Sequence, residues 1–429
     1  MQNEIHINGG IPLCGEVKIS GSKNATSAIL PALTLINSDF ESTIGNIPNI
    51  SDLQTLCNIL QEIGLSTTWC QSEKTIKVKG IVKNNILSDE YVPKIRASSL
   101  FLGALLAMTG EVRMPFCGGD QIGGVRPLDI HFYVFEKFNI ETKVENGYIH
   151  CKANTWPLKN TTIYLRYPSV GATENALLLV SKASGTTYIY NAASEPEITD
   201  MAVALTKMGV KISGAGTPII RVTGCHKLKP IQHEVIPDRL ELCTFLLALI
   251  CTRGKGVIRG GIPEHCISVL HTLIDAGVDI KYDSECVYVD ASYGEYKPIK
   301  VQALPYPGIP TDIQPLLSVF TALCNGNSNI HDTVFNGRFN YVTEFMKMGV
   351  EMTQLYDHLW VCGPQTFTNA LVHGADIRAA SALVLAGLCA PNETVIQGYY
   401  HIKRGYEDFE KKLVALGANV YHIDYQADK

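Results

Sequence analysis

The stretch "KMGVKIS", Lys207 to Ser213, contains the pattern that decides the fold. Met208 precedes a glycine, and Val210 and Ile212 then follow at the alternating spacing of a strand. A glycine between a helical pattern and an alternating one is typical of the point where a helix ends and a strand begins. The stretch therefore predicts a helix-to-strand junction at Gly209.

The same junction recurs five more times along the chain. The aligned positions are 68 to 75 residues apart, and they are Gly64, Asn139, Gly209, Gly277, Gly349 and Gly417. A second marker keeps this spacing: a polar residue opens an apolar run of helix length at Lys23, Arg96, Ser169, Asp238, Asp312 and Asp376. Most of these runs are apolar on several sides, which predicts covered central helices. Each repeat is therefore predicted to form helix, strand, helix and one or two strands, and six such α/β units fill the chain.

Composition limits the class of protein. A chain of 429 residues with 46% hydrophobic content can fill the cores of two or three domains, and its net charge of -5 gives no reason to expect nucleic acid or an anionic membrane as a partner. The apolar runs are too short to span a bilayer and the first residues lack a signal-peptide pattern, which predicts a soluble, cytoplasmic protein. The oligomeric state stays open.

The metal-binding residue types show no ligand pattern in the sequence. Thirteen cysteines without a Cys-x-x-Cys pair indicate reduced, buried thiols rather than disulfides or a zinc site. His6, His131, His331 and His401 are scattered, so each is interpreted as a structural histidine and no metal is expected.

A family resemblance extends over essentially the whole chain. It is carried in order by motifs that include "GEVKISGSKNATSAILPAL", "RASSLFLGALLA", "GGDQIGGVRPLDIH", "SVGATENALL", "IPTDIQPLL", "TVFNGRF", "DIRAASALVLAG" and "YHIKRGYEDFEKKLVALGA". With these motifs the sequence resembles the UDP-N-acetylglucosamine 1-carboxyvinyltransferases, a branch of the enolpyruvyl transferases. The resemblance implies transfer of the enolpyruvyl group of phosphoenolpyruvate to the 3-hydroxyl of UDP-N-acetylglucosamine with release of phosphate, the first committed step of peptidoglycan synthesis, and no cofactor.

The resemblance also implies a fold. It is the two-lobe, inside-out α/β barrel of six βαβαββ-type repeats, which agrees with the six repeats counted from the junctions. Residues 21–233 would form the first lobe, with a flexible catalytic loop at 114–127, and residues 1–20 with 234–429 would form the second.

Phosphoenolpyruvate carries a phosphate and a carboxylate, so its site needs several cations. The residues that match the family's phosphoenolpyruvate contacts are Lys23, Asn24, Arg126, Arg338, Arg378 and Arg404. Those that match its nucleotide-sugar contacts are Arg96, Arg126, Pro127, Leu128, Asp129, Ile130, Ser169, Val170, Asp312 and Val334. Asp312 is the expected base for the sugar hydroxyl and Asp120 the expected acid for the methylene carbon, while Lys23 and Arg404 complete the expected catalytic set.

The sequence departs from the family at the expected acid. Most members have a cysteine where this chain has Asp120, and an aspartate does not readily form the thioether that an epoxide drug makes with that cysteine. We therefore expect insensitivity to fosfomycin. Cys117 is the alternative acid, because a shifted loop could present its thiol instead, and the loop holds one extra residue in "IGGVRP".

Other departures concern the acceptor. Ser51 and the segment Arg166 to Pro168 stand where the family usually has lysines near the nucleotide, which leaves room for another nucleotide or sugar nucleotide, such as UMP, in secondary metabolism. A catalytically silent homologue that binds a sugar nucleotide and regulates a pathway is a further alternative. The retained residues argue against it, and they are Lys23, Asp312, Arg378 and Arg404. The motifs "SKS" and "SNR", which are expected in the shikimate-phosphate branch, are absent from this sequence, so that branch is disfavoured. A related RNA-phosphate cyclase would need ATP chemistry and a basic surface, and neither is visible in the sequence.

Overall fold

The computed structural model describes residues 3–120, 122, 126–335 and 337–424. These residues divide into two compact units, each with its own hydrophobic core. Unit 1 comprises Met1–Ser20, Asp120–Val125 and Pro237–Lys429, and unit 2 comprises Gly21–Gly119 and Arg126–Ile236. Of the loop expected at 114–127, residues 121 and 123–125 lie outside the described part of the chain.

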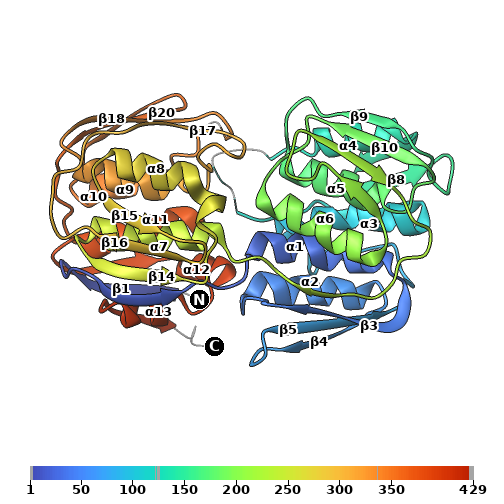
Figure 1. Ribbon diagram of the computed structural model, residues 1–429, viewed down its shortest axis with the longest axis horizontal. Coiled ribbons are helices and arrows are strands. Elements are labelled where there is room, and N and C mark those ends of the chain that lie inside the picture. The colour runs from blue at the N-terminus through green and yellow to red at the C-terminus, as the bar shows by residue number, and fades with distance from the viewer. Residues whose placement is uncertain (1–2, 121, 123–125, 336, 425–429) are drawn as a thin grey trace. The chain divides into compact units, whose positions relative to one another are not determined.

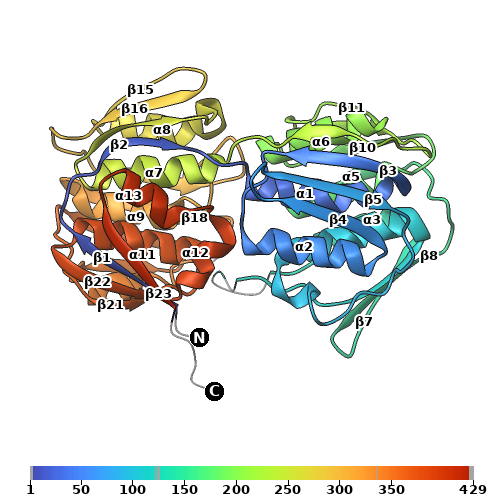
Figure 2. The same cartoon turned by 90° about the horizontal axis from the view of Figure 1, so that it is seen from below.

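Unit 1 contains three repeats, whose central helices α7, α9 and α11 lie inside while strands lie outside (Figures 1 and 2). Its elements are β1 (Asn3–Gly9), β2 (Cys14–Lys18), α7 (Arg239–Cys251), β14 (Lys255–Arg259), the 3-10 helix η4 (Pro263–Cys266), α8 (Ile267–Asp275), β15 (Asp279–Tyr282), β16 (Cys286–Asp290), β17 (Lys300–Ala303), α9 (Gln314–Leu323), β18 (Gly326–Asp332), α10 (Val342–Lys347), β19 (Met352–Leu355), β20 (His358–Gly363), β21 (Leu371–His373), α11 (Ile377–Cys389), β22 (Asn392–Gln397), α12 (Tyr399–Gly405), α13 (Phe409–Ala415) and β23 (Asn419–Asp424).

Unit 2 repeats the plan around the helices α1, α3 and α5. Its elements are α1 (Lys23–Ala32), η1 (Leu33–Leu35), β3 (Ser38–Gly45), α2 (Ser51–Glu62), β4 (Leu65–Cys70), β5 (Thr75–Gly80), η2 (Val92–Lys94), η3 (Arg96–Ser99), α3 (Leu100–Thr109), β6 (Glu111–Pro115), α4 (Asp129–Lys137), β7 (Ile140–Glu145), β8 (Tyr148–Ala153), β9 (Thr162–Tyr164), α5 (Val170–Val180), β10 (Thr186–Tyr190), α6 (Pro196–Met208), β11 (Lys211–Ser213), β12 (Ile219–Thr223) and β13 (Gln232–Glu234).

The described strands form six open sheets rather than one closed barrel. Five sheets have four strands and combine a parallel pair with antiparallel partners, and the sixth, β6-β8-β7, has three. Strands distant in sequence complete three of them: β1 pairs with β22 and β23, β2 with β14, and β13 with β3. The "inside-out" description therefore applies within each unit, where sheets cover buried helices.

The backbone confirms the predicted junctions at all six positions. Each junction residue has a positive φ, from 56° at Asn139 to 117° at Gly209, and each stands between a helix and the strand that follows it. Glycine adopts this left-handed conformation without steric cost, and asparagine tolerates it better than most residues. The repeated glycine or asparagine in the sequence thus reflects a left-handed backbone conformation that recurs at each junction.

The central helices are covered as their apolar patterns predicted. All thirteen residues of α7 are buried, as are the residues of α11 from Ile377 to Leu388. Some helices begin later than expected, because Asp312 lies in a turn before α9 and Arg96 opens a 3-10 turn before α3. Ser22, Ser169, Asp238 and Asp376 are N-caps whose side chains accept backbone N–H bonds.

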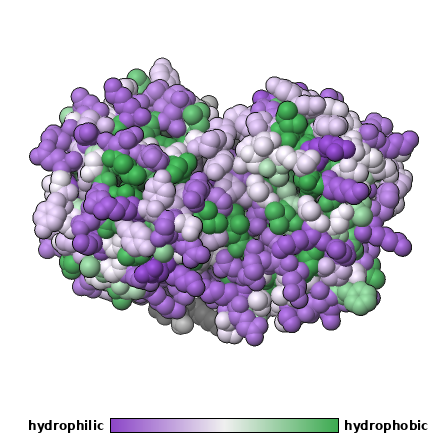
Figure 3. All heavy atoms as spheres, viewed as in Figure 1, coloured by the Kyte–Doolittle hydropathy of each residue, from purple (hydrophilic) through white to green (hydrophobic). Residues whose placement is uncertain are grey.

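The surface drawn in Figure 3 is mostly hydrophilic on both units, with hydrophobic residues in small scattered groups. Among the described residues, no helix has the length and apolar character that crossing a membrane requires.

Candidate active site

Asp312 is held between two arginines of unit 1. Arg338 Nη1 donates to its Oδ1 at 2.8 Å, and Arg378 Nη2 lies 3.4 Å from its Oδ2. The arginine side chains are 2% and 7% exposed, whereas that of Asp312 is 29% exposed. Two buried cations therefore orient a carboxylate that solvent or a substrate can reach.

Arg378 is itself fixed by Tyr406. Its Nη1 donates to the tyrosine hydroxyl at 2.6 Å, and that hydroxyl also contacts Thr244 Oγ1 at 2.8 Å. All three side chains are buried or nearly so, and Arg378 follows directly after the first residue of α11. The position of the guanidinium group is thus set by the packing of α7, α11 and the C-terminal segment.

Val334 is connected to Asp312 and its arginine partners through Asp332. The Val334 N–H donates to Asp332 Oδ1 at 2.9 Å, and Thr311 Oγ1 donates to Asp332 Oδ2 at 2.6 Å. Thr311 also accepts from Arg338 Nη1 at 3.0 Å. The loop after β18 and the turn before α9 are therefore joined by a continuous set of hydrogen bonds.

Asp120 belongs to unit 1 and lies at the N-terminus of α11. Its carboxylate pairs with Arg404, contacts His401 Nδ1 at 3.1 Å, and accepts the Ile377 N–H at 3.1 Å. Burial by itself would raise the pKa of Asp120, but the hydrogen bond from His401, the charge of Arg404 and the Ile377 N–H outweigh it and lower the pKa to about 2. In this arrangement Asp120 is an ionised carboxylate and has no proton to give.

In unit 2, Lys23 is the first residue of α1 and pairs with Asp52. Its Nζ lies 2.8 Å from Asp52 Oδ2, and the two side chains are 15% and 8% exposed. Asp52 stands in the first turn of α2. Asn24 is half-buried beside Lys23.

Arg96 bridges two parts of unit 2 that the sequence separates. Its Nη1 lies 3.3 Å from Cys117 Sγ, and its Nη2 donates to the Pro127 carbonyl at 3.2 Å. Cys117 is buried, and this burial raises the pKa of its thiol in spite of the nearby charges of Arg96 and Arg126. Arg96 and the segment Arg126–Pro127 are therefore brought together.

The residues after Pro127 form the start of α4. Leu128 is buried, Asp129 is exposed in the first turn, and Ile130 packs against the core. His131 contacts Asn175 Nδ2 through Nδ1 at 2.9 Å, and burial lowers the pKa of this histidine to about 3. A neutral His131 thus joins α4 to α5.

The N-terminus of α5 lies beside the same histidine. A Cβ at Gly171 would be 3.0 Å from His131 Cε1, which shows how closely the two helices approach. Ser169 caps α5 and Val170 is its first residue. Unit 2 therefore gathers the expected nucleotide-sugar residues Arg96, Arg126–Ile130, Ser169 and Val170 around the starts of α4 and α5.

Sequence reasoning missed three partners. The scattered histidine pattern predicts only a structural role for His401, whereas the structure places it against Asp120. Its spacing of three residues from Arg404 on one helix is the signal that could have indicated this contact. Tyr406 and Asp52 gave no signal in the sequence, because their contacts with Arg378 and Lys23 depend on tertiary packing.

Comparison with known proteins places these residues in a family context. The sequence profile of the EPSP synthase (3-phosphoshikimate 1-carboxyvinyltransferase) family matches residues 7–413. UDP-N-acetylglucosamine 1-carboxyvinyltransferase 1 of Staphylococcus aureus (strain N315) is 40% identical over 423 residues, covering 98% of this chain and 100% of the relative. UDP-N-acetylglucosamine 1-carboxyvinyltransferase 2 of Carboxydothermus hydrogenoformans is 39% identical, covering 97% and 98%.

Solved structures agree on the fold. The enolpyruvyl transferase NikO from Streptomyces tendae superposes with a TM-score of 0.88 at 25% identity, covering 98% of this chain and 99% of that one. An EPSP synthase from Acinetobacter baumannii has a TM-score of 0.74 at 15% identity over 99% of this chain and 100% of that one, which bears on the fold alone.

Proposed function

The chain belongs to the EPSP synthase family of enolpyruvyl transferases, and we propose that it transfers the enolpyruvyl group of phosphoenolpyruvate to the 3-hydroxyl of UDP-N-acetylglucosamine. The observation that carries this choice of acceptor is the 40% identity, over 98% of the chain, to a relative named for that reaction. With this acceptor the product enters peptidoglycan synthesis, and we expect the enzyme to work in the cytoplasm.

Asp312 is the proposed base. It would accept the proton of the sugar hydroxyl while the hydroxyl oxygen bonds to C2 of phosphoenolpyruvate and C3 takes up a proton. The tetrahedral intermediate then loses phosphate from C2 and a proton from C3, which restores the double bond. Arg338 and Arg378 support this role by fixing the orientation of a partly exposed carboxylate.

Asp120 is the proposed acid, but its ion pair must open first. Arg404 is also a proposed ligand of phosphoenolpyruvate, so a substrate anion would compete with Asp120 for the same guanidinium group. Once separated from Arg404 and His401, a buried Asp120 would be governed by desolvation, which raises the pKa of a carboxyl group. Binding of the substrate would in this way favour protonation of the Asp120 carboxylate. Cys117 is less suited, since it is buried against Arg96 rather than beside Arg404.

We propose that the other phosphoenolpyruvate contacts divide between its two anionic groups. Lys23 and Arg126, with the neutral amide of Asn24, would bind the phosphate, and Asp52 would be released from Lys23. Arg378 and Arg404 would bind the carboxylate, with Arg338 nearby. The nucleotide sugar would contact Arg96, the segment Arg126–Ile130, Ser169, Val170 and Val334. In this proposal residues 21–233 and residues 1–20 with 234–429 form the two lobes of the enzyme.

The acceptor is tested by measuring phosphate release from phosphoenolpyruvate with UDP-N-acetylglucosamine, UMP and other UDP-sugars in parallel. We expect turnover with UDP-N-acetylglucosamine and its loss in Asp312→Asn, whose amide cannot accept the proton. Turnover with UMP alone would instead favour the acceptor alternative suggested by Ser51 and by Arg166, which here stacks over the ring of Tyr133 at 4.9 Å. No turnover with any acceptor would contradict the proposal.

A further inference from the structure

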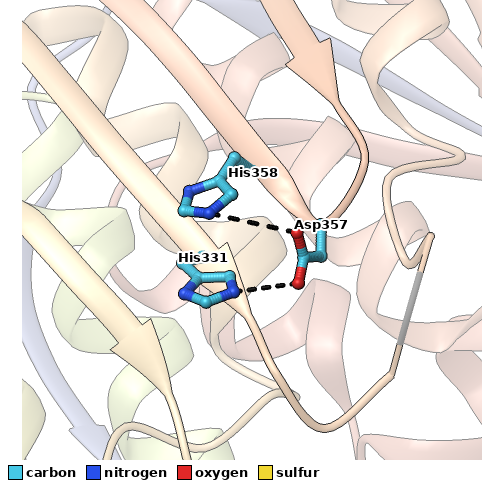
Figure 4. Close-up of side chains that lie close together, drawn as sticks. All are labelled: His331, Asp357 and His358. Atoms are coloured by element: carbon cyan, nitrogen blue, oxygen red, sulfur yellow. Dashed lines mark hydrogen bonds and ion pairs between the residues drawn. The ribbon is translucent and has the colours of Figure 1, made fainter.

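Three metal-ligating side chains meet at one end of the sheet β17-β18-β20-β19. Strand pairing places His331 of β18 directly opposite His358 of β20, and Asp357 is the second residue of the two-residue turn that joins β19 to β20. Figure 4 shows both imidazoles directed toward the carboxylate. His331 Nε2 lies 2.9 Å from Asp357 Oδ2, and His358 Nε2 lies 3.9 Å from Oδ1.

The two histidines lie on the outer face of the sheet. Their neighbours Ile330 and Leu359 are fully buried, whereas the side chains of His331, Asp357 and His358 are 26%, 35% and 37% exposed. The imidazole rings stack with centroids 4.0 Å apart. The group is therefore ordered by the strand register and remains open to ions from solvent.

The distances suit a small divalent cation. One ligand atom from each residue lies within 4.8 Å of the others. A tetrahedral zinc ion with bonds of about 2.0–2.1 Å needs its ligand atoms about 3.4 Å apart, so small rotations of partly exposed side chains are enough. No strand has to move, because the histidines are already paired across the sheet.

A neighbouring side chain favours the necessary form of one ligand. His358 Nδ1 lies 3.3 Å from Asn329 Oδ1, an acceptor that holds a proton on Nδ1. This hydrogen bond leaves the lone pair of Nε2 free to bind a metal, the arrangement usual for metal-ligating histidines. His331 would exchange its hydrogen bond to Asp357 for a bond to the ion.

We propose that His331, Asp357 and His358 form a binding site for one first-row divalent metal ion, with zinc as the best fit. Two imidazoles and a carboxylate are a common zinc set, and a water molecule would complete the tetrahedron. The ion would tie the β19–β20 turn to the end of β18, from which the chain continues through Asp332 to Val334. The site is thus a structural clamp at the base of a candidate substrate loop, separate from the reacting groups.

Calorimetric titration of the chelator-treated full-length enzyme with zinc chloride tests the site. A phosphine reductant is needed, because the chain has thirteen cysteines. We expect one site whose affinity falls at least tenfold in His331→Gln and in His358→Gln, and a zinc-dependent rise in the Tm of the wild type that both variants lose. His271→Gln is the control, since His271 is an exposed histidine of the same unit on α8 and its replacement should leave binding unchanged.

Two outcomes would overturn the proposal. One is equal affinity in the wild type, His331→Gln and His358→Gln. The other is a site that persists in those variants and disappears in Cys362→Ser, which would assign the ion to an exposed thiol on β20. Asp357→Asn provides a milder variant, should either histidine change lower the Tm of the metal-free protein.

Discussion

As the proposed acid, Asp120 would have to meet two opposing requirements with one side chain. An acid for the methylene carbon must hold a proton, whereas Arg404, His401 and the Ile377 N–H all stabilise its ionised form. In the free enzyme Asp120 is therefore an anion, at a place where an anionic substrate is expected to bind. Changes at this position separate the two roles.

Asp120→Asn removes both the proton and the competing charge. We expect kcat to fall by about 100-fold or more, the usual cost of losing a general acid, while the Kd for phosphoenolpyruvate decreases because Arg404 loses its internal partner. Steady-state kinetics and a binding titration measure the two effects. His401→Gln is the control: it removes a partner of Asp120 but keeps the acid, so kcat should change much less. Unchanged kcat in Asp120→Asn would contradict the assignment.

Asp120→Cys places the family's usual thiol at this position. We expect the wild type to resist fosfomycin and the variant to be inactivated over time, because a thiolate opens the epoxide and a carboxylate does so poorly. Mass spectrometry of the treated proteins locates any adduct. Wild-type inactivation with an adduct on Cys117, abolished by Cys117→Ser, would instead assign the reactive group to that thiol.

At the scale of single elements, the six junctions give the strongest test of the sequence pattern. Gly417, between α13 and β23, has a φ of 89° and no atom within 4 Å of the place that a Cβ would occupy. Gly417→Ala therefore tests backbone strain alone, and we expect a loss of about 1–2 kcal/mol in the free energy of unfolding. Chemical denaturation measures it. Asn139→Gly is the matched substitution, because glycine keeps the left-handed conformation. Its free energy of unfolding should stay within about 1 kcal/mol of the wild-type value.

The same elements explain what could be predicted. The junctions and the helix starts are local signals, so the repeat, the covered helices and the order of elements followed from the sequence. The contacts of the site are not local: Asp120 and His401 are 281 positions apart, and His331 meets His358 only through strand register. The family motifs indicated Asp312, Arg338, Arg378 and Arg404 as candidates. The ion pairs of Asp312 with Arg338 and Arg378, and of Arg404 with Asp120, became visible only in the folded chain.

At the scale of the whole molecule, both ends of unit 1 are fastened to α7 by a buried polar network. Glu241 in the first turn of α7 accepts the Ser20 N–H at 2.9 Å and pairs with Lys412 of α13. Ser20 Oγ accepts from Lys412 Nζ at 2.7 Å and donates to Glu407. The N-terminal strands and the C-terminal helix are therefore held together through two buried acids, Glu241 and Glu407.

The raised pKa of Glu241 predicts that the stability of unit 1 depends on pH. Burial raises its pKa from 4.5 to about 7, against the opposing attraction of Lys412. Because the folded state holds this proton more tightly than the unfolded state, the contribution is fully present below about pH 4.5 and is lost as pH rises through about 7. We expect Tm to fall between pH 5 and pH 8, and Glu241→Gln, which stays neutral and can still accept the Ser20 N–H, to reduce that fall.

Thermal unfolding across this pH range measures the effect, and Glu16→Gln is the control. Glu16 pairs with Arg259 on the surface of the same unit, with both side chains about half exposed, so its removal should leave the pH dependence as in the wild type. An equal pH dependence in the wild type and Glu241→Gln would show that Glu241 is ionised throughout. The Lys412 ion pair would then dominate over burial, and the two termini would be fastened by charge at every working pH.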